Sequence, residues 1–528
     1  MITNLKNLKK NNIIAAKVCI IGGGTAGLFL AHRLRLSKIP VTIVEAGEDQ
    51  TDKLKNFIYK IKNNSYEQSI VNKNFSLGGT STIWGGQMIP FQKSDINKRD
   101  YIGIKSWSIK YKQIAKYFPI VKKCFKFEFL KNKSKFFKKK IQYFNFSNKD
   151  FDLRFSTFIK PKIKNFYHFF YKNIKEDDKL NIYINAKVFE INNSKNNNSI
   201  KNIRAKSDNG NTLQIETDIV IICCGAIEST KLLLIYNKQN NNFIKNKKSP
   251  LGDFFCDQLS FVCGEFLIKD WKNFILYFSP IYKHGLIHNP RLELKNKFQK
   301  KNKISSAYCH FIFEHKKEYW LNLIKNLFIT KEIIFKSILS IILSSPKIIK
   351  DMYNLFFFRV LHKSVWFNTT SKILFSIVLE QLPDFNNKVF LKKNTLNTNK
   401  LIIDWKIKRK DTESIKLICN AFKNAWEKGG LNKIAELKVK MPKSFTTKNN
   451  FKAAHHHTGT IKIGSQRSNS VVNNNLKLWD INNLYICSTA VFPSSSCSNT
   501  GFILLALAAR LEDHLKKKII YSQNKKTV

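Results

Sequence analysis

The first fifty residues carry the clearest alternation of apolar and polar positions. Val18–Ile21 is a short apolar run that predicts a buried strand, and Ala26–Leu36 has the pattern of a helix. Pro40 interrupts the chain before Val41–Val44, which predicts a second apolar strand. Strand, helix and strand in this order require a parallel connection, so the sequence predicts a βαβ unit within an α/β domain.

A second strand-rich segment follows between residues 181 and 236. Alternating apolar residues around 182–191 and 203–215 predict extended, paired strands, with the polar run Asn192–Asn198 as a hairpin loop. Ile219–Cys224 reads as a buried strand, and Ala226–Tyr236 as a helix. Further along, Val389–Leu391 and Leu401–Trp405 predict paired strands, and Asp411–Lys428 predicts an amphipathic helix.

The most apolar stretch runs from Trp320 to His362. Lys336 and Lys347 interrupt it, and no run of about 18 uncharged apolar residues occurs in the chain, so we expect no membrane-spanning helix. Two interpretations stay open for the stretch. It forms a buried pair of helices, or it forms a basic, aromatic-rich helix that rests on a membrane surface.

The large net positive charge does not by itself indicate a nucleic-acid partner. The 528 residues carry a formal net charge of +54, dominated by lysine. The lysines are dispersed, with Lys138–Lys140 as the densest run, whereas a nucleic-acid site is expected to be a clustered patch. Lys, Asn, Ile and Phe all have A/T-rich codons, so codon bias accounts for much of this charge. We therefore predict a solvated basic surface and no nucleic-acid partner.

Cysteine usage indicates a reducing compartment. None of the ten cysteines forms a C-x-x-C pair or has the spacing of a metal site, and Cys19 and Cys223 lie in apolar runs. No secretory signal precedes the first strand. We expect a cytoplasmic protein, with peripheral contact to a membrane as the open alternative.

Three glycines after the first strand give the first chemical motif. Gly22, Gly24 and Gly27 form G-x-G-x-x-G at the start of a helix, where the backbone can approach a pyrophosphate and the helix N-terminus favours anions. Glu45 ends the second strand, where a carboxylate binds a ribose hydroxyl. This fingerprint predicts a dinucleotide site, but it does not distinguish FAD from NAD.

Three further blocks distinguish the two cofactors. They are the glycine-rich loop Gly78–Gly86, the strand-to-helix segment Asp218–Leu234, and the C-terminal segment that begins with His456-His457-Thr458-Gly459-Thr460. Together they resemble the glucose–methanol–choline (GMC) oxidoreductases, a family of FAD-dependent enzymes that act on alcohols, sugars and polyols. About half of the chain is covered by the resemblance.

The resemblance implies a set of site residues. The general base would be His456, Asn499 would hydrogen-bond the substrate oxygen, and hydride would pass to flavin N5. A histidine is a suitable proton acceptor near neutral pH. The cofactor-binding residues implied are Gly22, Gly24, Thr25, Ala26, Gly27, Glu45, Ala46, Gly79, Thr80, Ser81, Trp84, Gly85, Val188, Gly225, Ser488 and Thr489.

Some alternatives stay open within this site. His457 is a competing base, and His456 could be a core histidine. Three consecutive histidines also suggest a metal, but neighbouring side chains diverge and no acidic or cysteine partner is near in the sequence, so we predict none. Ser488 stands where many relatives have Asp or Gly, and Thr500 and Ile503 depart from the family's N-P-x-x-T pattern. These departures leave the strength of catalysis open.

The fold expected from the resemblance is a discontinuous, Rossmann-like FAD domain joined to an α+β substrate domain on an antiparallel sheet. The FAD domain would comprise residues 1–90, 181–250 and 451–528, and the substrate domain residues 91–180 and 251–450. The substrate would be a small alcohol, and the electron acceptor is not predicted. The rival interpretations are an NAD-dependent dehydrogenase and a catalytically weakened basic flavoprotein, or a membrane- or nucleic-acid-associated binding protein.

Overall fold

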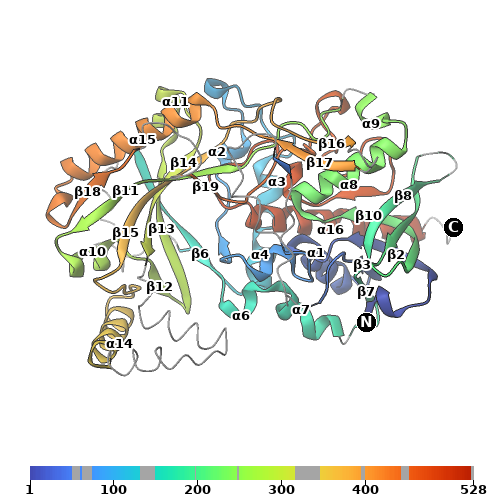
Figure 1. Ribbon diagram of the computed structural model, residues 1–528, viewed down its shortest axis with the longest axis horizontal. Coiled ribbons are helices and arrows are strands. Elements are labelled where there is room, and N and C mark those ends of the chain that lie inside the picture. The colour runs from blue at the N-terminus through green and yellow to red at the C-terminus, as the bar shows by residue number, and fades with distance from the viewer. Residues whose placement is uncertain are drawn as a thin grey trace.

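The computed structural model describes residues 1–49, 60–61, 74–130, 149–175, 177–194, 196, 198–246, 249–314, 345–393, 399–441 and 451–524. Two large sheets lie side by side, each with its own covering helices (Figure 1). This arrangement confirms the predicted fold class. The part of the apolar stretch from residue 320 to 344 lies outside the described residues.

The first sheet has the predicted βαβ unit at its centre. Its order is β1-β7-β3-β2-β10-β9-β8, with β20 beside β10. Strands β1, β7, β3, β2, β10 and β20 pair in parallel. Strand β9 pairs antiparallel with both β10 and β8. The strands are β1 Ile2–Asn4, β2 Asn11–Ile21, β3 Val41–Val44, β7 Leu180–Ile184, β8 Lys187–Asn193, β9 Ile200–Lys206, β10 Thr212–Ile222 and β20 Leu484–Ile486.

Apolar helices cover this sheet. Helix α1 (Thr25–Leu36) follows the glycine turn and packs against the C-terminal helix α16 (Gly501–Asn524), which is buried along Phe502–Leu511. Helix α7 (Phe166–Lys175) also contacts α1, and α8 (Gly225–Gln239) follows β10. The shorter helices are α2 Lys93–Ile96, α3 Tyr111–Ala115, α4 Phe118–Cys124, α6 Pro161–Lys164 and α9 Phe243–Asn246.

The second sheet is antiparallel throughout. Its order is β18-β11-β15-β14-β13-β6-β5, with β12 beside β13 and β19 beside β11. The strands are β5 Gln87–Met88, β6 Phe151–Phe158, β11 Gln258–Ile268, β12 Ile281–Lys283, β13 Leu286–Leu294, β14 Ala307–Glu314, β15 Lys372–Glu380, β18 Ala435–Val439 and β19 Phe451–Ala453.

Helix α15 (Arg409–Lys428) closes one face of this sheet. Its buried residues recur every three or four positions, and Phe422 stacks on Phe375 with ring centroids 4.3 Å apart. Trp426 lies against Phe266 from β11 at 4.8 Å. Helices α10 (Trp271–Phe278), α11 (Asn296–Asn302) and α14 (Ser345–Val360) complete this half. The amphipathic pattern therefore predicted the burial of α15 correctly.

A small third sheet, predicted to belong to the substrate domain, packs against the first half of the molecule. Strand β16 (Lys388–Lys393) contacts α8 of the first half, and β17 (Asn399–Asp404) pairs with both β16 and β4 (Lys60–Ile61). The predicted substrate domain, residues 251–450, includes this hairpin. Strand pairing also puts β5 and β19 in the second sheet, a few residues across the predicted boundaries at 90 and 451. The chain therefore crosses between the halves more often than the motifs indicated.

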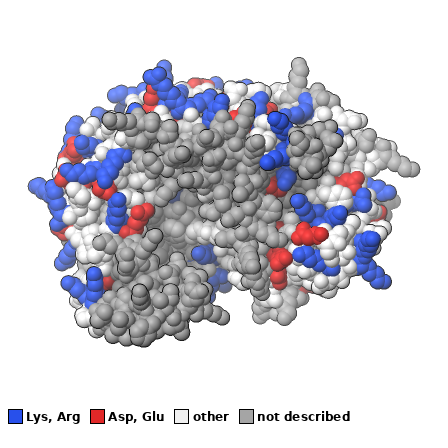
Figure 2. Space-filling view, viewed as in Figure 1, with Lys and Arg blue, Asp and Glu red and all other residues white. Residues whose placement is uncertain are grey.

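Charge is scattered over the visible surface. On the face drawn in Figure 2, Lys and Arg side chains occur over both halves, with Asp and Glu among them. Across the described part of the chain, no helix is both long enough and apolar enough to cross a bilayer. None of the ten cysteines, all of which are described, takes part in a disulfide.

Candidate active site

A cavity of about 1040 Å³ lies where the two halves meet. Parallel strands β2, β3 and β10 end at the same edge of the first sheet, and the residues that follow each of them line this cavity. The second sheet contributes the side chains of Gln258, Tyr308 and His310. Ligands of open α/β sheets bind at this edge, so the cavity lies where the glycine motif predicts a dinucleotide.

The glycine turn is closed by backbone contacts that only glycine allows. Gly22 has φ of +101°, and a Cβ on Gly27 would lie 2.0 Å from the carbonyl oxygen of Gly22. Gly24 differs, because a Cβ there would meet nothing nearer than 3.9 Å, on the Cα of Gly79. Gly22 and Gly27 thus maintain the turn itself, whereas Gly24 faces open space in the cavity.

The second glycine loop lies directly against the first. The N–H of Gly78 donates to the carbonyl oxygen of Gly23 at 2.8 Å, and a Cβ on Gly79 would lie 2.9 Å from the Cα of Gly24. Trp84 anchors the far end of this loop by donating from Nε1 to the carbonyl oxygen of Lys164 at 2.6 Å. The structure therefore brings the two predicted loops together at one wall.

Glu45 lines the cavity with its carboxylate fixed by the backbone. One oxygen accepts from Gly23 N–H at 2.7 Å and the other from Gly47 N–H at 2.9 Å. Burial raises the pKa of Glu45, and these N–H donors partly offset that effect. Each carboxylate oxygen keeps a further lone pair, so a ribose hydroxyl can still donate to it.

Most of the residues predicted to bind the cofactor line the cavity. They are Gly22, Gly24, Thr25, Ala26, Glu45, Ala46, Gly79, Thr80, Trp84, Gly85, Val188, Gly225, Ser488 and Thr489.

Gly27 and Ser81 do not line it, which corrects the prediction for both. Gly27 packs beneath Gly22, and the fully buried Ser81 hydroxyl donates to Gly78 O at 2.6 Å and accepts from Phe166 N–H at 3.0 Å. Their role is to shape the two loops from behind. The sequence motif does not distinguish a residue that touches the ligand from one that supports the loop.

Ser488 supplies a test of whether a ligand belongs in the cavity. Its residue lines the cavity and is 1% exposed, yet within the described residues its Oγ has no hydrogen-bond partner. A buried hydroxyl without a partner is costly, so a partner from a bound group is expected. The glycine turn, the N-termini of α1 and α8, and this hydroxyl are a donor set that fits a flavin dinucleotide.

His456 lines the cavity, and one of its ring nitrogens is fixed by a hydrogen bond. Its Nδ1 lies 2.8 Å from Oε1 of Gln258, and its backbone N–H donates to Asp257 at 2.8 Å. Burial is the main influence that lowers the pKa of His456 to about 4, with His455 and Arg291 as further causes. The imidazole is therefore neutral near pH 7 and able to accept a proton.

Gln258 determines which tautomer His456 adopts. The side-chain nitrogen of Gln258 donates to the carbonyl oxygens of Ser496 at 2.8 Å and Ser498 at 2.7 Å. Carbonyls only accept, so the amide nitrogen must point toward them and Oε1 must point toward His456. Nδ1 of His456 then carries the proton, and the lone pair is on Nε2.

The neighbouring histidines also line the cavity, but they make different contacts. His457 is 4% exposed, stacks on Phe255 with centroids 5.3 Å apart, and has its Nε2 3.5 Å from Asp257. His455 adopts the left-handed conformation with φ of +57°, and its ring is edge-on to His457 at 6.4 Å. Among the described residues no group of three or more metal-ligating side chains gathers.

Asn499 lines the same cavity as His456, and a buried arginine fixes its orientation. Nη2 of Arg291 donates to Oδ1 of Asn499 at 3.0 Å, and the guanidinium lies 3.9 Å from the ring centre of Tyr308. An arginine only donates, so the oxygen of the amide must face it. The amide nitrogen of Asn499 is thereby directed away from Arg291 and can donate to a ligand.

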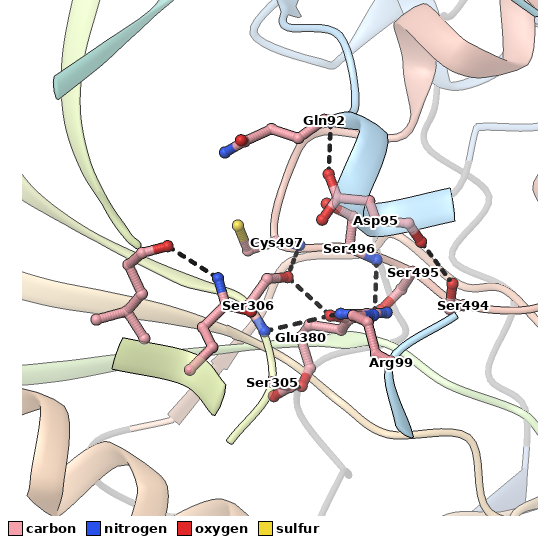
Figure 3. Close-up of polar contacts among 12 residues, drawn as sticks. Gln92, Asp95, Arg99, Ser305, Ser306, Glu380, Ser494, Ser495, Ser496 and Cys497 are labelled. Carbon is pink, nitrogen blue, oxygen red and sulfur yellow. Dashed lines mark hydrogen bonds and ion pairs between the residues drawn. The ribbon is translucent and has the colours of Figure 1, made fainter. Parts of the chain in front are cut away.

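The loop that carries Asn499 is clamped by a buried ion pair, drawn in Figure 3. Glu380, at the end of β15, accepts from Arg99 and also from Ser306 Oγ at 2.7 Å and Ser496 N–H at 3.2 Å. Ser306 Oγ in turn accepts from Cys497 N–H at 3.0 Å. The second sheet therefore holds the loop immediately before Asn499.

Sequence reasoning missed Gln258, Arg291 and Glu380. They come from β11, β13 and β15, and the motifs that point to the site do not include them. Gln258 is the first residue of β11 and Arg291 lies among other polar residues of β13, so the strand patterns did not single them out.

Comparison with known proteins agrees with this geometry. Residues 383–508, which include His456 and Asn499, match the GMC oxidoreductase family. This C-terminal segment is similar to the GMC oxidoreductases. No curated protein sequence matches the chain. The predicted resemblance is therefore confirmed for residues 383–508.

Solved structures of this fold extend the likeness to nearly the whole chain. Pyridoxine 4-oxidase from Mesorbium loti aligns with a TM-score of 0.60 at 13% identity, over 94% of this chain and 99% of that one. A formate oxidase from Aspergillus oryzae, a variant solved to study modification of its FAD, aligns with a TM-score of 0.59 at 15% identity, over 96% and 98%. At these identities the likeness establishes the fold of the chain and nothing further.

Proposed function

We propose that the chain is a GMC oxidoreductase that binds FAD in the cavity and oxidises a small-molecule alcohol. FAD is the cofactor of the family, and the glycine turn, the α1 N-terminus and the Ser488 hydroxyl suit its pyrophosphate and polar ring atoms. Bound FAD would supply the acceptor for a hydride from the alcohol carbon. The match over the C-terminal block argues against the rival nicotinamide-dependent dehydrogenase.

One observation carries the proposal: the fixed tautomer of His456. Gln258 accepts from Nδ1, so the lone pair of Nε2 is available to take the hydroxyl proton of a bound alcohol. The lowered pKa of His456 keeps that lone pair unprotonated near pH 7. When the proton moves to Nε2, the ring becomes an imidazolium whose Nδ1–H still donates to Gln258.

Asn499 complements the base on the substrate oxygen. Because Arg291 holds Oδ1, the amide N–H groups of Asn499 are left to donate to an oxygen that becomes negative as its proton leaves. His456 thus removes the proton and Asn499 stabilises the oxygen. Tyr308 and Val378 also line the cavity and add apolar surface to it.

The electron acceptor is proposed from the solved neighbours. Pyridoxine 4-oxidase and formate oxidase are both named as oxidases, so dioxygen is the first acceptor to test. The substrates in those names belong to those proteins. For this chain we propose the class alone, a small molecule that carries a CH–OH group.

The test has two stages. First, the purified protein should show a flavin absorption band and release FAD on denaturation. Second, alcohols added without oxygen should bleach that band, and His456→Ala should bind flavin but bleach at least about 100-fold more slowly. A colourless protein that takes up no FAD would defeat the cofactor assignment, and wild-type bleaching by His456→Ala would defeat the base assignment.

A further inference from the structure

Helix α14 presents an apolar stripe to solvent. Ile349, Met352, Tyr353, Phe356 and Val360 recur every three or four residues and are 68, 58, 64, 68 and 41% exposed. At 3.6 residues per turn these side chains lie along one side of the helix. A contiguous apolar stripe of this kind is uncommon on a solvated surface and marks an interaction site.

The opposite side of α14 is firmly attached to the protein. Phe358 is buried in a small apolar cluster with Ile275 and Trp366, separate from the main core. Asp351 is 4% exposed and accepts a hydrogen bond from Asn368 at 3.0 Å. The helix therefore has an inner side that fixes it and an outer side that is available for a partner.

The charges on α14 indicate what that partner is. Lys347, Lys350 and Arg359 are exposed, and on a helical wheel Lys350 and Arg359 flank the apolar stripe on its two sides. Asp351 is the only acidic residue of α14, and it faces inward. The outer side is therefore apolar with a cationic border.

We propose that α14 docks on an anionic membrane surface. Phe356 and its apolar neighbours would enter the boundary between headgroups and acyl chains, and the flanking cations would contact lipid phosphates. The net charge of +54 favours such a surface and disfavours self-association, which would bring like charges together. In Figure 1, α14 projects from the end of the second half that is remote from the first sheet, so nothing described there hinders approach.

The experiment is co-sedimentation of the FAD-loaded protein with phosphatidylcholine vesicles, with and without phosphatidylserine. We expect binding only when phosphatidylserine is present, and weaker binding as salt is added. Ile349→Glu should weaken it at least about tenfold. Ile520→Glu makes the same substitution at a 47% exposed isoleucine of α16. This variant is the matched control and should bind like wild type. Lys350→Glu with Arg359→Glu should reduce both binding and its salt dependence, without touching the apolar stripe.

Three results would overturn the proposal. They are no pelleting with phosphatidylserine vesicles, equal effects of Ile349→Glu and Ile520→Glu, and a vesicle-independent dimer in analytical ultracentrifugation that Phe356→Glu abolishes. The last would identify a second copy of the chain as the occupant. All these variants lie outside the cavity, so flavin reduction by alcohol should proceed normally in each.

Discussion

Arg99 and Glu380 form a bidentate ion pair in the interior, with side chains 3% and 0% exposed. Arg99 lowers the pKa of the Glu380 carboxyl despite its burial. The same carboxylate accepts from Ser306 and from the backbone of Ser496. One ion pair therefore links the substrate-domain sheet to the loop that leads to Asn499.

Breaking this pair should destabilise the fold. Glu380→Gln leaves Arg99 as a buried charge without its counterion, and we expect a loss of about 3–5 kcal/mol in the free energy of unfolding. Glu413→Gln removes the carboxylate of an exposed pair with Arg409 and should cost no more than about 0.5 kcal/mol. Denaturant unfolding of both variants checks this. Equal losses in the free energy of unfolding would show that the buried pair stabilises the fold no more than the exposed pair does.

Gln258 should act on the rate through His456. In Gln258→Leu the imidazole loses the acceptor that fixes its tautomer, and kcat should fall roughly 10-fold or more while FAD binding is retained. In Gln258→Glu a carboxylate can still accept from Nδ1, but its charge should raise the pKa of His456. The pH profile of flavin reduction separates the two variants. A purely structural role would lower activity in both without moving the profile.

The acidic limb of the pH–activity profile should lie at an unusually low pH. The ordinary pKa of a histidine, 6.5, is lowered to about 4 for His456, so the base is unprotonated above about pH 4 in the free enzyme. As pH falls below that value, kcat/KM should drop about tenfold per pH unit. A limb near pH 6.5 would indicate that a different group, or a solvated His456, is the base.

Asn499→Asp should separate the contact with Arg291, which positions the side chain, from hydrogen-bond donation to the substrate oxygen. The carboxylate can pair with Arg291, so the fold should persist, but the side chain no longer donates to the substrate oxygen. We expect about a 100-fold loss in kcat, measured as anaerobic flavin reduction. Asn499→Ala provides the comparison, because it removes the donor without adding charge. A wild-type rate in Asn499→Asp would remove the residue from the mechanism.

Two glycines of one motif should behave differently. Gly27→Ala puts a Cβ 2.0 Å from Gly22 O, so soluble folded protein should be lost or strongly reduced. Gly24→Ala meets no atom within 3.9 Å, so the apoprotein should fold normally while its affinity for FAD falls. Fluorescence titration with FAD, alongside the thermal midpoint of each apoprotein, distinguishes these outcomes. Equal FAD affinity in Gly24→Ala and wild type would argue that the pyrophosphate does not approach this turn.

The sequence predicted local structure well where the pattern was local. The β2–α1–β3 unit, α8, α15 and the β16–β17 hairpin all occur where periodicity and glycine positions indicated. The two glycine loops and the C-terminal block also meet as the motifs required. What could not be predicted depends on pairing between distant strands. Gln258 reaches His456 across 198 residues, and Arg291 reaches Asn499 across 208.

The sequence also could not show which residues of a motif line the cavity and which support it. Ser81 and Gly27 belong to the right motifs, yet neither lines the cavity, because the Ser81 hydroxyl bonds to the backbone of Gly78 and Gly27 packs against Gly22. Likewise the hairpin at 388–404 gave no sign that it packs on α8 rather than within the second sheet.

The cysteine that precedes α8 makes the cavity accessible to thiol chemistry. Of the ten cysteines, Cys124 and Cys224 are the two that are not fully buried, and Cys224 lines the cavity. Burial raises the pKa of the Cys124 thiol to about 12, which makes it slow to alkylate. A maleimide should therefore modify the apoprotein chiefly at Cys224, and protection of that one sulfur would report how much of the protein is loaded, without any knowledge of the substrate.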